Sequence, residues 1–335
     1  MNTLIIDKKK LPANKSQKEE FLNQYFSGLL VEACDVDNQV SVSLSWPNNI
    51  TYFVDPDLQK GLSWWNKDLK PENIHQQYQR SPLYQLSLTD NWSLYSWSLW
   101  LQSKNNQAST VDVIILHVDD HTDFMSPLLT KEGDIWADLI TGNAFDINQP
   151  ETVKAAVLSG AISVGSFIAP FFHGIRNITF RHLRNKYRTG IAESKTSLYP
   201  SLTYDQLLRE GQLRPSISLK SFNSIGHRSV DYQVSDSATD WLSNLPKNIP
   251  VLLHIDMDYF NNRFDGDSDW QERVNKLDPT QDEISTQIRS LFSHLWQKVE
   301  RSQVEDITVA LSPGFFPAEY WQQSIELLHE QLIHE

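Results

Sequence analysis

Two unbroken apolar runs most constrain how this chain can fold. The first is Val111–Val118 and the second is Ile249–Ile255. A strand that is apolar on both sides must be covered on both faces, which is typical of a parallel sheet between layers of helices. An amphipathic helical pattern over Asp282–Val299 precedes a further apolar strand, Val304–Leu311. This alternation predicts a three-layer α/β fold with a mainly parallel sheet.

The rest of the chain predicts shorter elements and one domain. Strands are expected at Val40–Trp46, Ile50–Val54 and Ile175–Phe180, helices at Thr152–Phe172, Tyr204–Glu210 and Ala318–Leu332, and a loose polar arm over residues 1–25. No change in composition separates two domains within residues 1–335. We therefore expect a single domain, with a β-rich N-terminal segment over residues 1–85 and a core over residues 86–325.

Composition excludes several classes of protein. The 335 residues carry 29 basic and 42 acidic side chains, a net charge of −13. A nucleic-acid-binding protein needs a basic face, so that class is not expected, whereas a cationic substrate fits. No apolar run approaches the roughly 20 residues of a membrane span. The single cysteine, Cys34, excludes an internal disulfide and suits the reducing cytoplasm. Nothing in the sequence sets the oligomeric state.

Acidic residues follow both apolar strands at the same spacing. The first strand continues into Asp119, His121 and Asp123, and the second into Asp256 and Asp258. In open α/β sheets, ligands bind beyond the carboxyl ends of the strands. Four carboxylates and an imidazole that meet there would repel one another unless cations lay among them. The residues therefore predict a site for one or two divalent cations, with manganese ahead of zinc or magnesium.

These motifs resemble those of a known family. The segment from His117 to Asp123 resembles the D-A-H-x-D motif of the arginase and agmatinase (ureohydrolase) fold, and Asp256-Met-Asp258 resembles its second motif, S-x-D-x-D. The segments Ser163–Pro170 and Ala310–Pro317 look like the peptide-arginase branch. The resemblance covers roughly residues 85–325. It implies a hydrolase that converts arginine side chains of ribosomally made precursor peptides to ornithine and releases urea.

The resemblance also implies how two Mn²⁺ ions would be held. Asp119 and Asp256 would bridge the ions, Asp123 would complete one, and His121 with Asp258 would complete the other. The family has a further metal-binding histidine upstream of the first motif, but the matching stretch here contains Asp90 and Asn91 instead. Either of these supplies an oxygen ligand, or one metal is bound more weakly, or the site holds one metal.

The residues that would handle the substrate are less defined. The proton-shuttling histidine of arginases is absent from its usual place, which leaves His173 as the candidate. An acid that orients the guanidinium group is sought among Asp278, Asp282 and Glu283. The loop that binds the carboxylate of free arginine is not recognisable, as expected for an enzyme that acts on arginine within a peptide.

Three other functions are consistent with the same residues. The first is a zinc-dependent deacetylase or amidohydrolase of the same fold, with one Zn²⁺ in an Asp-His-Asp site. The second is an arginase or agmatinase acting on a small free guanidino compound, and the third is a binding protein with a degenerate site. Two manganese ions per chain support guanidinium hydrolysis, one zinc supports the deacetylase, and the absence of bound metal supports the binding protein.

Overall fold

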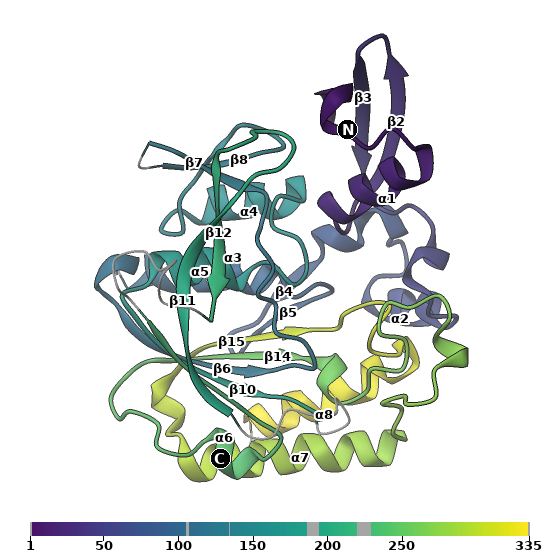
Figure 1. The fold of residues 1–335 in the computed structure, drawn as a ribbon. Helices are drawn as coiled ribbons and strands as arrows, with labels where there is room; N and C mark the ends of the chain where they lie inside the picture. The colour runs from purple at the N-terminus through teal and green to yellow at the C-terminus, as the bar shows by residue number, and fades with distance from the viewer. Residues whose placement is uncertain (1, 105–106, 134, 186–193, 220–228, 334–335) are drawn as a thin grey trace.

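The computed structural model describes residues 2–104, 107–133, 135–185, 194–219 and 229–333. Its centre is a nine-stranded sheet with the order β12-β11-β13-β10-β6-β14-β15-β5-β4 (Figure 1). The six strands from β13 to β5 are parallel, and β12, β11 and β4 add antiparallel edges. The strands are β4 (Tyr78–Arg80), β5 (Gln85–Ser87), β6 (Asp112–Val118), β10 (Asn177–Leu183), β11 (Ser194–Tyr204), β12 (Leu213–Ser218), β13 (Val230–Ser235), β14 (Val251–Asp256) and β15 (Val304–Ala310).

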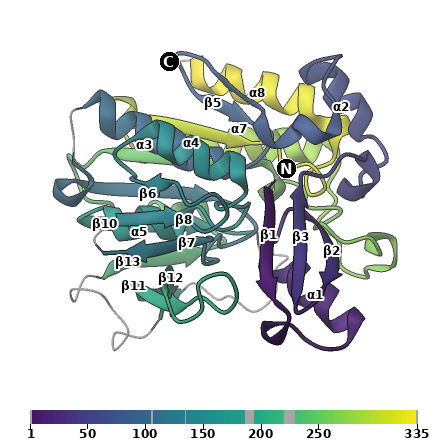
Figure 2. The ribbon, with the colours of Figure 1, turned by 90° about the horizontal axis from the view of Figure 1, so that it is seen from above.

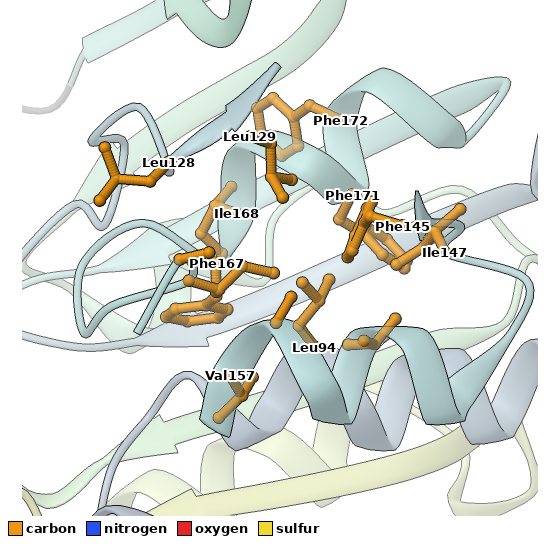
Figure 3. Close-up of a cluster of buried hydrophobic side chains, with 14 of the residues drawn as sticks. Leu94, Leu128, Leu129, Phe145, Ile147, Val157, Phe167, Ile168, Phe171 and Phe172 are labelled. Carbon is orange, nitrogen blue, oxygen red and sulfur yellow. The ribbon is translucent and has the colours of Figure 1, made fainter. Parts of the chain in front are cut away.

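Helices cover both faces of this sheet, as the sequence predicts. Alternate residues of β6 enter different cores: Ile115 packs in one, whereas Ile114 and Leu116 pack in the other. The first core is closed by α3 (Trp92–Ser103), α4 (Pro150–Ser159) and α5 (Ile168–Gly174). The second is closed by α2 (Leu58–Trp65), α6 (Ala238–Trp241), α7 (Gln281–Lys298) and α8 (Trp321–Ile333). Figure 3 shows Leu94, Val157 and Phe171 of α3, α4 and α5 among the buried apolar side chains of the first core.

The N-terminal residues form a small folded unit rather than the expected loose arm. Strand β1 (Asn2–Asp7) pairs with β3 (Gln39–Ser45), which pairs with β2 (Leu30–Val36), and helix α1 (Lys15–Tyr25) packs against β2. The alternating residues Val40, Val42 and Leu44 of β3 are buried, and this gives the polar arm a core on which to fold. Figures 1 and 2 show this purple unit beyond one end of the large sheet.

Four other expected elements differ in the structure. The expected helix Thr152–Phe172 is two helices, because Gly160 adopts a left-handed conformation (φ 85°) and ends α4. Residues 204–210 close strand β11 with a turn instead of forming a helix, and Ile50–Phe53 is a 3₁₀ turn rather than a strand. The tryptophan-rich stretch before Val111, where no helix is expected, contains the buried helix α3. A small second sheet joins β7 (Leu129–Glu132), β8 (Ile135–Asp138) and β9 (Ala144–Phe145).

The parallel strands bring several loops to one edge of the sheet. Strands β6 and β14 are direct neighbours, with Val118 opposite Ile255, so the residues that follow them emerge side by side. Strand β15 pairs with β14 on its other side and leads into Ser312. In the described part of the chain, none of the helices combines the length and the apolar character needed to cross a bilayer.

Candidate metal centre

The two acidic motifs meet in one cavity at this edge of the sheet. The cavity has a volume of about 620 Å³, and the side chains of His121, Asp123, Asp256 and Asp258 line it. Asp119 lies directly beneath, fully buried, and its carboxylate Oδ1 accepts a hydrogen bond from the backbone N–H of His121 (2.5 Å). The sequence expectation that these five residues converge agrees with the structure.

Short contacts join the two motifs. Nδ1 of His121 lies 2.8 Å from Oδ2 of Asp258 and 3.7 Å from Oδ1 of Asp119. The three side chains place one ligand atom each within 4.8 Å of one another, which suits a cation. Asp256 is oriented from the other side, because the hydroxyl of Ser312 donates to its Oδ2 (2.6 Å). Asp123 adopts a left-handed backbone (φ 53°), a conformation that aspartate tolerates better than most residues.

The site concentrates negative charge away from water. Burial raises the pKa of Asp119 and Asp256 well above the usual range, and the neighbouring carboxylates raise it further. Burial also raises the pKa of Asp123 to about 6. Burial alone would lower the pKa of His121, but the Asp258 and Asp265 carboxylates outweigh it and raise the pKa to about 11. In the metal-free chain, protons therefore do part of the neutralisation that a cation would do.

Three buried carboxylate oxygens around the cavity lack a hydrogen-bond partner within the described residues. They are Oδ2 of Asp119, Oδ2 of Asp123 and Oδ1 of Asp90. A buried carboxylate oxygen without a donor costs free energy unless a cation or water satisfies it. The donor set is carboxylate oxygens with one imidazole, which suits Mn²⁺ or Zn²⁺. The residues therefore fit a divalent metal.

The structure separates the two candidates for the missing upstream ligand. Asp90 is 5% exposed and lines the cavity, and its pKa is raised well above the usual range by burial and by Asp123. Asn91 uses both ends of its amide elsewhere: its Nδ2 donates to the carbonyl of Ile162 (2.9 Å) and its Oδ1 accepts from the hydroxyl of Thr89 (2.8 Å). Asp90 is therefore the better candidate for a ligand, and Asn91 holds the loop in place.

A second layer of polar groups orients the ligands. Nε2 of His121 lies 3.0 Å from Oδ1 of Asp265, and Oδ2 of Asp265 accepts from Nη2 of Arg273 (2.8 Å). Such a carboxylate fixes the ring of a metal-binding histidine and its tautomer. The acidic loop Asp265–Asp269 thus contributes one residue to the orientation of His121.

Three buried histidines beneath the carboxylates were not singled out from the sequence. His182, His117 and His254 lie in register on neighbouring strands β10, β6 and β14. Nδ1 of His117 lies 2.9 Å from Nδ1 of His254, and its Nε2 lies 3.5 Å from Oδ2 of Asp119. Burial lowers the pKa of His182 and of His254 to about 3, so these rings are neutral. A signal was present, since His117 and His254 each precede a ligand aspartate by two residues.

The expected substrate-handling residues lie away from the cavity. His173 lies on α5, where its Nε2 is 3.1 Å from the carbonyl of Ser216 and its ring packs against Trp136. Asp278 accepts hydrogen bonds from Asn261 and Arg263. Asp282 and Glu283 lie in the first turn of α7, where Glu283 forms a capping box with Thr280. Because none of the four lines the cavity, the structure does not support a proton shuttle at His173 or guanidinium binding at the other three.

Away from the acidic residues, much of the cavity lining is apolar. Nine of its 28 lining residues come from residues 27–75, before the first strand of the large sheet. Arg184 is the only lysine or arginine in the described lining, and its Nε donates to the carbonyl of Asp120 (3.0 Å). The cavity therefore has an acidic inner end and a largely apolar entrance.

Neither a scan against models of known protein families nor a search of curated proteins finds a match for this chain. Its function is therefore inferred from the chemistry of the cavity.

Proposed function

We propose that this protein is a metal-dependent hydrolase of guanidinium groups that converts arginine side chains of a peptide to ornithine. The observation that carries the proposal is the convergence of buried carboxylates that lack hydrogen-bond partners, around one histidine, at the carboxyl end of a parallel sheet. The resemblance of the two acidic motifs to those of arginases favours this reaction over other metal-dependent hydrolyses.

Six residues would hold two Mn²⁺ ions. Asp119 of the first motif and Asp256 of the second would take the bridging positions, as the resemblance implies. Asp123 and Asp90 would complete one site, and His121 and Asp258 the other. Bound divalent cations would lower the pKa of water towards neutrality, which would supply a nucleophile at neutral pH.

The protein contributes binding and orientation to this reaction. The acidic inner end attracts a guanidinium group, and the buried surroundings strengthen that attraction. Water adds to the guanidinium carbon, the bond from that carbon to the side-chain nitrogen breaks, and urea and a protonated amine result. Asp265 holds the His121 ring in place, and Ser312 holds Asp256.

The test is incubation of the protein with Mn²⁺ and an arginine-containing peptide. We expect release of one urea per processed arginine. The mass of the peptide should fall by about 42 units, the mass of one CN₂H₂ group, for each arginine. A D256N variant, which removes a bridging carboxylate, should reduce the rate at least about 100-fold. A protein that binds Mn²⁺ but releases no urea from peptides, free arginine or agmatine would contradict the proposal.

One observation favours a second function, a single-zinc deacetylase or amidohydrolase. Asp119, His121 and Asp258 place three ligand atoms close together, and these three residues would be enough for a one-metal site of the Asp-His-Asp type. Elemental analysis distinguishes the two functions: two manganese ions per chain support guanidinium hydrolysis, whereas one zinc supports amide hydrolysis.

A further inference from the structure

The entrance of the cavity is built by a segment outside the large sheet. Trp46, Tyr52, Phe53 and Ile74 from this segment line the cavity. The Trp46 ring stacks on His75, with centroids 3.9 Å apart and 12° between the planes, and its Nε1 donates to the carbonyl of Leu158 (3.2 Å). The stacking joins two parts of this segment, and the hydrogen bond to Leu158 ties the segment to α4 of the core.

The facing side of the entrance is also apolar. Phe124, Met125, Val164 and Phe315 of the core line it. Three apolar side chains at the entrance stay accessible to solvent: Tyr52 is 46% exposed, Met125 50% and Val164 38%. Clustered exposed apolar side chains next to a polar cavity mark a surface that binds a ligand. We call this surface the vestibule. It consists of Tyr52, Met125 and Val164 together with the aromatic lining residues Trp46, Phe53, Phe124 and Phe315.

The vestibule is a poor match for a small charged substrate. Free arginine with its side chain at the acidic inner end would place its ammonium and carboxylate near the apolar walls, where both groups lose hydration. In a peptide these two groups are neutral amides, and the neighbouring side chains can cover the walls. The cavity volume of about 620 Å³ lies in the usual range for ligand pockets, so the cavity can hold more than one side chain of a peptide.

We propose that the vestibule binds bulky apolar residues that flank a cationic residue of a peptide, and so selects the peptide sequence. The identity of the cationic residue as arginine rests on the proposed function, but the preference for apolar neighbours does not. The acidic inner end supplies the charge complementarity, and the vestibule supplies apolar contact area.

The experiment uses peptides that cannot be hydrolysed at a guanidinium group. Calorimetry compares acetyl-Leu-Lys-Leu amide with acetyl-Gly-Lys-Gly amide, which both carry a cation, on the full-length protein with Mn²⁺. Partial burial of two leucines should give a preference of about tenfold in Kd. Y52A and, independently, M125S should each reduce that preference at least about threefold. Y204A is the matched control, because Tyr204 is 67% exposed and does not line the cavity.

The possible results separate the two proposals. A tenfold preference that falls in Y52A or M125S but not in Y204A supports the vestibule, whether or not urea is ever released from arginine peptides. Equal Kd values for the two peptides, or the same preference in all variants, would overturn it. Urea release from arginine peptides without any preference for apolar neighbours would leave the proposed reaction standing and reject the vestibule alone.

Discussion

At the scale of single residues, neighbours in the chain such as Asp90 and Asn91 have different roles in the structure. The i, i+2 spacing after two buried strands was enough to predict that Asp119, His121, Asp123, Asp256 and Asp258 converge, because the carboxyl ends of parallel strands share one edge. The sequence could not choose between Asp90 and Asn91, since that choice depends on which loop reaches each side chain. His173, Asp278, Asp282 and Glu283 have suitable chemistry but lie in caps and turns elsewhere.

The first prediction tests the assignment of Asp90. D90N should lower the bound Mn²⁺ from two ions per chain to one, because an amide is a much weaker ligand than a carboxylate. N91A removes two structural hydrogen bonds, so it should lower the free energy of unfolding by roughly 1–3 kcal/mol and keep both ions. Elemental analysis and urea denaturation read the two effects. The assignment is wrong if N91A loses a metal and D90N does not.

The second prediction concerns a polar group buried beside His254, one of the three buried histidines in register on β10, β6 and β14. Thr308 lies on β15 opposite His254, is fully buried, and its Oγ1 has no partner among the described residues. T308V keeps the side-chain shape and removes the unsatisfied hydroxyl, so it should raise the free energy of unfolding by about 1 kcal/mol. Thermal or urea denaturation measures the change. A destabilised variant would show instead that an internal water binds the hydroxyl.

At the scale of elements, continuous apolar strands and amphipathic helices were predictable from the sequence. The helix in the tryptophan- and serine-rich stretch and the break between two apolar helices were not. Strands β6, β14 and β15 and helix α7 match the sequence prediction closely. Helix α3 was not predicted because serines are interspersed among its tryptophans and leucines, and both the polar and the apolar side chains are buried. The break between α4 and α5 escaped it because the apolar pattern continues across Gly160.

The third prediction tests that break. In G160A, the new Cβ needs a left-handed backbone and would lie 2.7 Å from Cδ1 of Leu29. Gly142 is the matched control, since it has a similar φ of 75° but no atom within 4 Å of an added Cβ. We expect G142A to cost about 1 kcal/mol of unfolding free energy and G160A about 2–4 kcal/mol. Equal losses in urea denaturation would mean that Leu29 moves aside freely.

At the scale of the whole molecule, the position of the N-terminal segment could not be predicted from the sequence. Its contacts with the core join residues far apart in the chain, such as Trp46 with Leu158 and Tyr25 with Asp205. Local patterns carry no information on such pairs. The segment matters for function because it supplies one wall of the cavity whose acidic end belongs to the sheet.

The last prediction follows from the charge that the whole fold gathers at the candidate metal centre. The pKa of His121 is raised to about 11, and burial raises the pKa of Asp119 and Asp256 well above the usual range. A raised pKa means that the folded chain holds protons that the unfolded chain has released. Stability is therefore lost as the pH rises towards the folded pKa, by about 1.4 kcal/mol per pH unit for His121 alone.

The informative range is pH 7.0 to 8.5. The buried His182 and His254, whose pKa is lowered to about 3, affect stability only below about pH 6.5, where the unfolded chain begins to bind their protons. In EDTA the Tm should fall across this range. Mn²⁺ at a fixed concentration, set to about 100 times its Kd at pH 7.0, should add roughly 2.7 kcal/mol at that pH. That gain should grow with pH, because the metal replaces protons on the same ligands. H121N should make the Tm of the metal-free protein depend less on pH. A metal-free Tm that rises between pH 7.0 and 8.5 would contradict the close packing of carboxylates at this site.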